Sequence, residues 1–230
     1  MPFLLATLLL ALGAAATAPY QEYILAPSSR TIRPTSVYLS SGSLSSENVL
    51  LDGQVSSGRS LTLEEFNSSV TYDFGKNVAG WVNFNTTSSG GSVGFTFSES
   101  SLWISSEACD ATASTLDAPL VFNISGAGQY SAPLEKQRGA FRYMTIVNLG
   151  TGSLSINDLW VYFTAMPHWE GDALRGYTGW FHSNDERLNR YVNMCSTAVK
   201  YSSHRLGRVW YAGKHAAQYD LQLNLLHRIT

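Results

Sequence analysis

Short segments in which apolar and polar side chains alternate recur along the chain from residue 35 to residue 163. Such alternation places one set of side chains on one face of a β-strand. It is clearest at residues 92–98, where Val93, Phe95 and Phe97 alternate with small or polar residues. Further strands are predicted at residues 35–39, 61–65, 120–122, 129–132, 141–147 and 154–163, the last with a break at Asn157 and Asp158. Gly, Ser and Asn turns separate these segments without intervening helices, which predicts an all-β fold, an antiparallel β-sandwich or jelly roll.

The segment TYDFGKNVAGWVNF, residues 71–84, holds two apolar runs around a polar centre. Tyr72 and Phe74 alternate with Thr71 and Asp73, and a second strand-like run begins at Trp81. The centre carries Gly and Asn, which tolerate the positive φ that turns require. The pattern therefore predicts a β-hairpin or a strand–loop–strand unit.

Residues 99–119 show no sustained period and are predicted to form a long loop, a kind of segment that is often functional. The loop holds the densest carboxylates of the chain, Glu99, Glu107, Asp110 and Asp117. Trp103 is a candidate to stack on a sugar ring, and Glu107 or Asp110 to accept hydrogen bonds from its hydroxyls. The simpler interpretation, which we favour, is a solvated loop with Trp103 packed on the sandwich.

A short helical segment is predicted near the C-terminus. Ser183-Asn184-Asp185-Glu186 matches a capping box, in which the Ser hydroxyl and the Glu carboxylate satisfy backbone N–H groups at the start of a helix. We therefore expect a helix to begin near Asn184.

The first 18 residues are predicted to be a signal peptide. The apolar run at residues 3–12 is shorter than the roughly 20 residues of a membrane span, and Ala-rich cleavage signals follow it. Asn67, Asn85 and Asn123 each begin an Asn-X-Ser/Thr sequon and are candidate glycosylation sites. We therefore expect a secreted, extracellular glycoprotein with no membrane partner after cleavage.

The amino-acid composition limits the classes of partner that the chain is expected to bind. The formal net charge is −2, only 14% of residues are charged and no Lys/Arg run occurs, which argues against nucleic acid and anionic membranes as partners. The 12% of aromatic residues is typical of β-domains that handle carbohydrate and also of sandwiches with no ligand. Cys109 and Cys195 are able to pair in an oxidising compartment, but no metal-ligand spacing is present, so we expect no metal and no cofactor. Trp81 and Trp160 lie in strand runs, which favours packing in the core or on a sheet face.

Four segments, taken in order, resemble α-L-rhamnosidases, most closely the secreted fungal members. These enzymes are inverting glycoside hydrolases with an (α/α)6, or six-hairpin, catalytic barrel. The segments are DFGKNVAGWVNF (residues 73–84), FTFSESSLWISSEACDAT (95–112), GAFRYMTIVNLG (139–150) and GWFHSNDERLNR (179–190). The resemblance implies a β-sandwich accessory domain at residues 19–166, followed at 167–213 by a linker and the start of the first helix of the barrel.

The resemblance ends at Arg190. A VWYAG sequence of the family type recurs at residues 209–213, but residues 191–208 and the tail at 214–230 are foreign to the family. We hypothesise that both foreign segments are intron read-through, which uninterrupted transcript reads across codons 190 and 213 as the sole isoform would refute. The family's acid and base are carboxylates of the barrel, so no catalytic residue is predicted here.

The expected function is therefore that of the N-terminal β-sandwich portion of a rhamnosidase-like hydrolase. The full-length relatives hydrolyse terminal α-L-rhamnosides, and this chain is expected to be inactive alone. Two alternatives remain: a free-standing, lectin-like carbohydrate-binding module, and a structural domain that docks onto a barrel.

Overall fold

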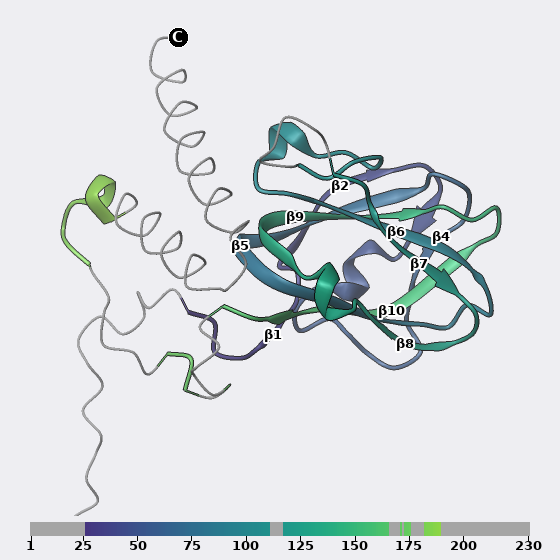
Figure 1. Cartoon of the computed structure of the whole chain (residues 1–230), viewed down its shortest axis with the longest axis horizontal. Helices are drawn as coiled ribbons and strands as arrows, with labels where there is room; N and C mark the ends of the chain where they lie inside the picture. Colours follow the sequence, from purple (N-terminus) through teal and green to yellow (C-terminus); the bar gives the residue numbers. More distant parts are fainter. Residues whose placement is uncertain (1–25, 111–116, 166–170, 172, 176–181, 190–230) are drawn as a thin grey trace, which may run out of the picture.

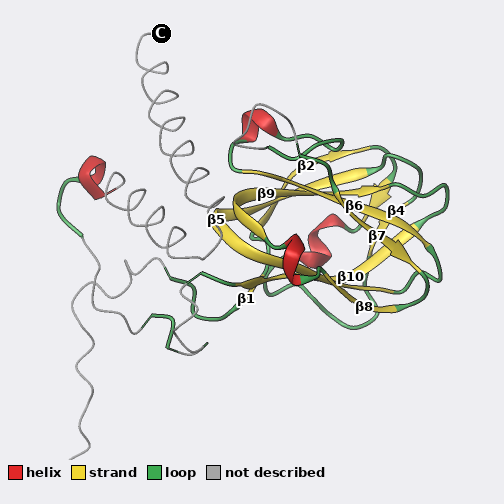
Figure 2. Cartoon of the chain, viewed as in Figure 1, coloured by secondary structure: helices red, strands yellow, loops and turns green. Residues whose placement is uncertain are grey.

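The computed structural model describes residues 26–110, 117–165, 171, 173–175 and 182–189. Nearly all regular structure in these residues is β-strand (Figures 1 and 2). The strands are β1 Thr31–Ile32, β2 Ser36–Ser41, β3 Leu44–Ser45, β4 Leu61–Leu63, β5 Ser69–Thr86, β6 Gly91–Ser98, β7 Leu120–Ile124, β8 Gly128–Ser131, β9 Arg138–Asn148 and β10 Leu154–Phe163. The predicted signal peptide, the foreign segments and Cys195 lie outside the described residues.

All strand pairs in the described residues are antiparallel, and they form the predicted β-sandwich. The hydrogen-bonded order is β3–β4–β10–β5–β9–β6–β7, with β1 added to β10 and with β2 and β8 added to β5. Large apolar side chains fill the space between the layers. The largest of those that are fully buried include Tyr72, Phe84, Phe95, Phe141, Met144, Ile156 and Leu159.

Strand β5 joins the two layers. Its first half, Ser69 to Asp73, pairs with β2 and β9, whereas Val82 to Thr86 pairs with β10, and Asn83 to Thr86 also pairs with β8. One strand therefore supplies the centre of both layers, and the side chains of its two halves enter the same core.

The prediction of a hairpin or of two strands at residues 71–84 is wrong, because β5 is a single strand of 18 residues. Between Asp73 and Val78 it advances five residues while β9 advances only two, from Tyr143 to Phe141, so the extra residues form a bulge. Gly75 takes φ 73°, and its N–H donates to the Asp73 carboxylate at 2.6 Å. The turn-forming residues thus bend the strand from one layer into the other instead of reversing it.

An ion pair fixes the bulge. The Arg142 guanidinium donates from Nε and Nη2 to the two carboxylate oxygens of Asp73, each at 2.9 Å. Burial opposes ionisation of Asp73, but the hydrogen bonds from Arg142 and from the Gly75 N–H outweigh it and lower the pKa of Asp73 below its usual value.

This lowered pKa predicts loss of stability in acid. The ionised Asp73 stabilises the fold above its unfolded pKa of about 3.9, and the contribution disappears as pH falls through the lower folded value. We expect Asp73→Asn to reduce the free energy of unfolding by about 2 kcal/mol at neutral pH, and by progressively less as the pH falls below the unfolded pKa of about 3.9 and through the lower folded value. Denaturant titrations of both proteins across this range measure the difference, and two parallel curves would contradict the role given to Asp73.

The helix predicted near Asn184 is present at residues 186–189, but its predicted cap is wrong. The Asp185 carboxylate accepts from the N–H groups of Arg187 and Leu188 at 2.9 and 3.2 Å, so Asp185 is the cap. The Ser183 hydroxyl instead accepts from the Asp185 N–H at 3.2 Å and lies 3.0 Å from Asn189 Oδ1. The residue that caps the helix is therefore Asp185, two positions after the Ser183 that the capping-box pattern indicated. No helix in the described part of the chain has the length and apolar character needed to cross a membrane.

The other predicted strands are confirmed with shifted ends, whereas the two-residue strands β1 and β3 were not predicted. The expected break at Asn157 and Asp158 is a bulge within a continuous β10, where the register with β5 shifts between Ile156 and Asp158. The described part of the long loop carries the short 3-10 helix η3 (Ser101–Trp103) and one isolated bridge between Cys109 and Asp117.

Candidate functional site

Aromatic side chains gather on the outward face of β10. Leu159, Val161 and Phe163 are buried, so Trp160 and Tyr162, which alternate with them, point away from the core. Trp160 is half-buried and Tyr162 is 38% exposed. These two rings are therefore available on the surface of the sheet.

The neighbouring strands extend this outward face. Register places Trp81 of β5 beside Tyr162, Asn83 beside Trp160 and Asn85 beside Asp158. On the far side of β5, Ser131 and Gln129 of β8 lie beside Asn83 and Asn85, and Thr31 of β1 lies beside Tyr162. We name the surface formed by Arg33, Trp81, Asp158, Trp160 and Tyr162 the tryptophan face.

Two rings of the tryptophan face stack on each other. The Trp81 and Tyr162 ring centroids are 5.1 Å apart, and their planes differ by 10°. Such stacking fixes both rings on the sheet. A ligand therefore meets an ordered aromatic surface with little side-chain freedom left to lose.

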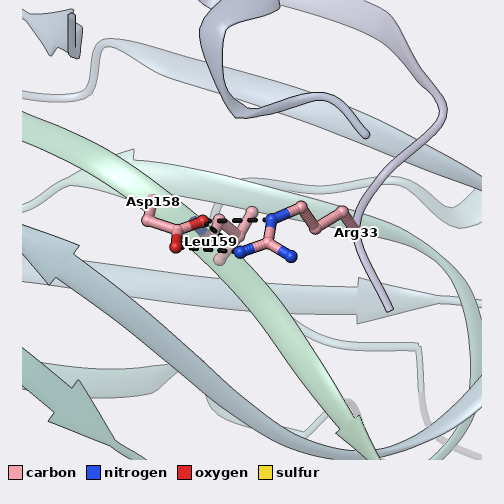
Figure 3. Close-up of polar contacts among 3 residues, drawn as sticks. All are labelled: Arg33, Asp158 and Leu159. Carbon is pink, nitrogen blue, oxygen red and sulfur yellow. Dashed lines mark hydrogen bonds and ion pairs between the residues drawn. The ribbon is translucent and has the colours of Figure 1, made fainter. Parts of the chain in front are cut away.

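An ion pair between Arg33 and Asp158, shown in Figure 3, lies near the third ring of the face, Trp160. Arg33, directly after β1, donates from Nε to Asp158 Oδ1 at 3.2 Å and from Nη2 to Oδ1 and Oδ2 at 3.1 and 2.9 Å. The Leu159 N–H also donates to Asp158 Oδ1, at 2.8 Å. The Arg33 guanidinium lies 6.0 Å from the centroid of the Trp160 ring, at the limit of a cation–π contact. The pair thus carries no net charge and helps to hold Trp160.

Removing Arg33 is expected to destabilise the chain measurably. Asp158, whose side chain is only 16% exposed, would lose its charged partner, at a cost of about 1–3 kcal/mol. Arg59→Ala is the matched control, since Arg59 is exposed and surface changes usually stay within about 0.5 kcal/mol. Denaturant unfolding of both variants measures this, and equal small effects would show that the ion pair does not order the face.

The residues predicted from sequence to bind sugar lie elsewhere, on the loop after β6. Trp103 is in η3 and is 50% exposed, and Glu107 and Asp110 are also exposed. The Asp110 N–H donates to the Phe97 carbonyl at 2.9 Å, which ties the loop to β6. Trp103, Glu107 and Asp110 remain a predicted site and serve below as a comparison for the tryptophan face.

The three sequons differ in their surroundings. Asn67 is exposed in a turn with φ 64°, and Asn123 is exposed on β7. Asn85 is half-buried on β5 and lies opposite Asp158. An N-linked glycan at Asn85 would therefore cover the Asp158 end of the tryptophan face, and a ligand reaches that end only where Asn85 is unglycosylated.

The reactive groups of the described residues do not form a metal site, since no three or more His, Cys, Asp and Glu side chains among them gather around a common point. The Cys109 side chain is buried, and its Sγ lies 3.4 Å from the Ala118 carbonyl oxygen. Burial raises the pKa of the Cys109 thiol and keeps it in the neutral form.

The outward position of two residues of the tryptophan face, Trp160 and Tyr162, could be predicted from the sequence. The period of two in β10 puts Trp160 and Tyr162 on the face opposite Leu159 and Val161. Of the two placements expected for Trp160, in the core or on a sheet face, the structure shows the second. Arg33 could not be assigned in this way, since it contacts Asp158 from 125 residues away in the chain.

No protein-family model and no curated protein matches this chain. Its structure is similar to a GH78 family rhamnosidase of Bacillus sp. GL1, with a TM-score of 0.51 and 15% identity over 68% of this chain and 16% of that one. It is also similar to a rhamnosidase from Klebsiella oxytoca solved with rhamnose bound, with a TM-score of 0.49 and 15% identity over 79% of this chain and 36% of that one. A fucose-binding module of Streptococcus pneumoniae matches with a TM-score of 0.40 and 16% identity over 59% of this chain and 94% of that one.

The Bacillus match shows a shared fold, and the two matches with TM-scores below 0.5 support no further inference. This chain spans 16% and 36% of the lengths of the two rhamnosidases.

Proposed function

We propose that this chain is a carbohydrate-binding module and that the tryptophan face binds the saccharide. The observation that carries the proposal is the ordered set of Trp81, Trp160 and Tyr162 beside the Arg33–Asp158 pair. A sugar ring presents C–H groups on its faces and hydroxyls around its edge. An outward face that combines aromatic rings with fixed polar groups matches both features.

The charge of the face favours a neutral saccharide. Arg33 and Asp158 neutralise each other, so the face offers no net charge to attract a polyanion. The overall net charge of −2 also disfavours anionic polymers.

The polar margin of the face favours a hydroxyl-rich ligand over an apolar protein surface. Asn85 is half-buried, and Gln129 and Ser131 are exposed, along the same outward face. Amide and hydroxyl side chains both donate and accept, as sugar hydroxyls do. An apolar partner would leave these groups unsatisfied, at a cost of about 1–3 kcal/mol for each buried group.

A narrower function is supported by the four ordered segments that resemble α-L-rhamnosidases and by the fold shared with the Bacillus rhamnosidase. In this proposal the chain is the N-terminal β-sandwich of a secreted rhamnosidase-like hydrolase, and its ligand is a rhamnoside. Hydrolysis then belongs to a barrel beyond the sandwich, and the chain alone binds without cleaving.

A titration of the purified chain tests both levels of the proposal. The probes are rhamnose, an aryl α-L-rhamnoside, and neutral and acidic plant polysaccharides, followed by tryptophan fluorescence and by release of reducing sugar. We expect saturable binding of neutral saccharides, weaker binding of acidic ones and no hydrolysis. Failure of every neutral saccharide to bind would overturn the proposal, and release of rhamnose would show that the chain holds catalytic groups of its own.

A further inference from the structure

The geometry of the tryptophan face points to a ligand class: we infer that it binds an internal stretch of an extended neutral glycan and not a single terminal sugar. This inference rests on the proposed function. The support comes from the length of the face, the order of its side chains and its open margins.

The first support is the size of the face. From Tyr162 to Asp158 the chain advances four residues along β10, about 13 Å at the usual rise of a strand. Across the strands, β10 and β5 are joined by β1 at the Tyr162 end and by β8 at the Asp158 end, so the face spans two strand spacings at either end, about 10 Å. A pyranose ring is similar in size to the phenol ring of a tyrosine, so one sugar covers only a fraction of this surface.

The second support is the order of the side chains along β10, which form three successive rows about 7 Å apart. The first row is Thr31–Tyr162–Trp81, the second is Trp160–Asn83–Ser131, and the third is Asp158–Asn85–Gln129. Asn83 is buried, so only Trp160 and Ser131 of the second row reach the surface. The first row is mainly aromatic, the second is mixed and the third is polar. A glycan that follows β10 therefore meets aromatic rings at one end and groups that accept and donate hydrogen bonds at the other.

The third support is the openness of the margins. Thr31 at the β1 side, and Gln129 and Ser131 at the β8 side, are all exposed. A site for a terminal sugar encloses its ligand, as small-molecule pockets do. The exposed margins of this face allow a chain to enter on one side and leave on the other.

The position of Arg33 further limits where a glycan can lie on the face. It reaches from the end of β1 over Trp160 to Asp158 and so occupies the β1 side of the second and third rows. At these rows the glycan therefore lies on the side of Trp160 away from Arg33, toward β5 and β8. A glycan therefore contacts Tyr162 at the first row and Gln129 at the third.

A length series tests the inference. The full chain is titrated calorimetrically with rhamnose and with xylo-, manno- and cello-oligosaccharides of increasing length, from one sugar upward. We expect affinity to rise about tenfold or more between one and three sugars and then to level off once the rows are filled.

The Gln129→Ala variant tests whether the ligand contacts the third row. Gln129 is exposed on β8, so its removal leaves the core intact. We expect about fivefold weaker binding of the trisaccharide that binds best and unchanged binding of the disaccharide, while Gln54→Ala, an exposed glutamine away from these rows, changes neither.

The outcomes separate the inference from the proposed function. A single sugar that binds within twofold of the longest chain, or a Gln129→Ala variant that binds every length normally, would overturn the inference and leave the proposed function standing. If no saccharide of any length binds, the proposed function fails, and the inference fails with it.

Discussion

Replacing Gly80 with alanine is expected to destabilise the chain by more than about 4 kcal/mol, a large part of the roughly 5–15 kcal/mol that stabilises a domain. A Cβ at this position would lie 1.9 Å from the carbonyl oxygen of Tyr162 and 2.8 Å from its carbonyl carbon. These are backbone atoms of β10, so no change of rotamer relieves the overlap. β10 is itself paired with β5, β4 and β1, and moving it would disrupt the layer that carries the tryptophan face.

Gly126→Ala is the matched control. A Cβ at Gly126 meets no atom within 4 Å, so its effect is expected to stay within about 0.5 kcal/mol. Circular dichroism during denaturant unfolding measures both variants. If Gly80→Ala unfolds at the same midpoint as Gly126→Ala, the close packing of β5 on β10 at this point is not as described.

Replacing Trp160 with alanine is expected to weaken saccharide binding about tenfold to a hundredfold, which corresponds to about 1.4–2.8 kcal/mol. The substitution removes the central aromatic ring of the tryptophan face and the ring over which Arg33 lies. The fold should persist, since the buried neighbours Leu159 and Val161 supply the core contacts of this part of β10. Calorimetric titration of the best neutral ligand measures the loss, and circular dichroism confirms the fold.

Trp103→Ala distinguishes the two candidate sites. Trp103 is half exposed on η3, in the loop for which the sequence predicted sugar contacts with Glu107 and Asp110. We expect Trp103→Ala to bind saccharide normally. Loss of binding in Trp103→Ala together with normal binding in Trp160→Ala would move the site to the loop.

The positions of the strands were predictable wherever local alternation decided the outcome. Val93, Phe95 and Phe97 predicted β6 and its buried face, and all three side chains are in the core. β5 was mispredicted because Gly75 and Asn77 fit a turn as well as a bulge. Pairing of β5 with β9 and β10, which lie 60 or more residues beyond Gly75 and Asn77, decides between a turn and a bulge. The local sequence pattern carries no information on this pairing.

The candidate site was predictable only in part, for a similar reason. Alternation along β10 identifies Tyr162 as outward-facing, and the same pattern in β5 identifies Trp81. Their stacking depends on the register between β5 and β10. The Arg33–Asp158 pair depends on β1 joining the edge of β10, and a two-residue strand leaves too short a pattern to predict.

The most direct test of the account is to follow the indole N–H signals of the six tryptophans by NMR while a neutral oligosaccharide is added. Assignment comes from single Trp→Phe variants. The account predicts that the signals of Trp81 and Trp160 shift together and saturate, while the signal of Trp103 stays in place. Shifts confined to Trp103, or no shift at Trp81 and Trp160 on saturation, would contradict it.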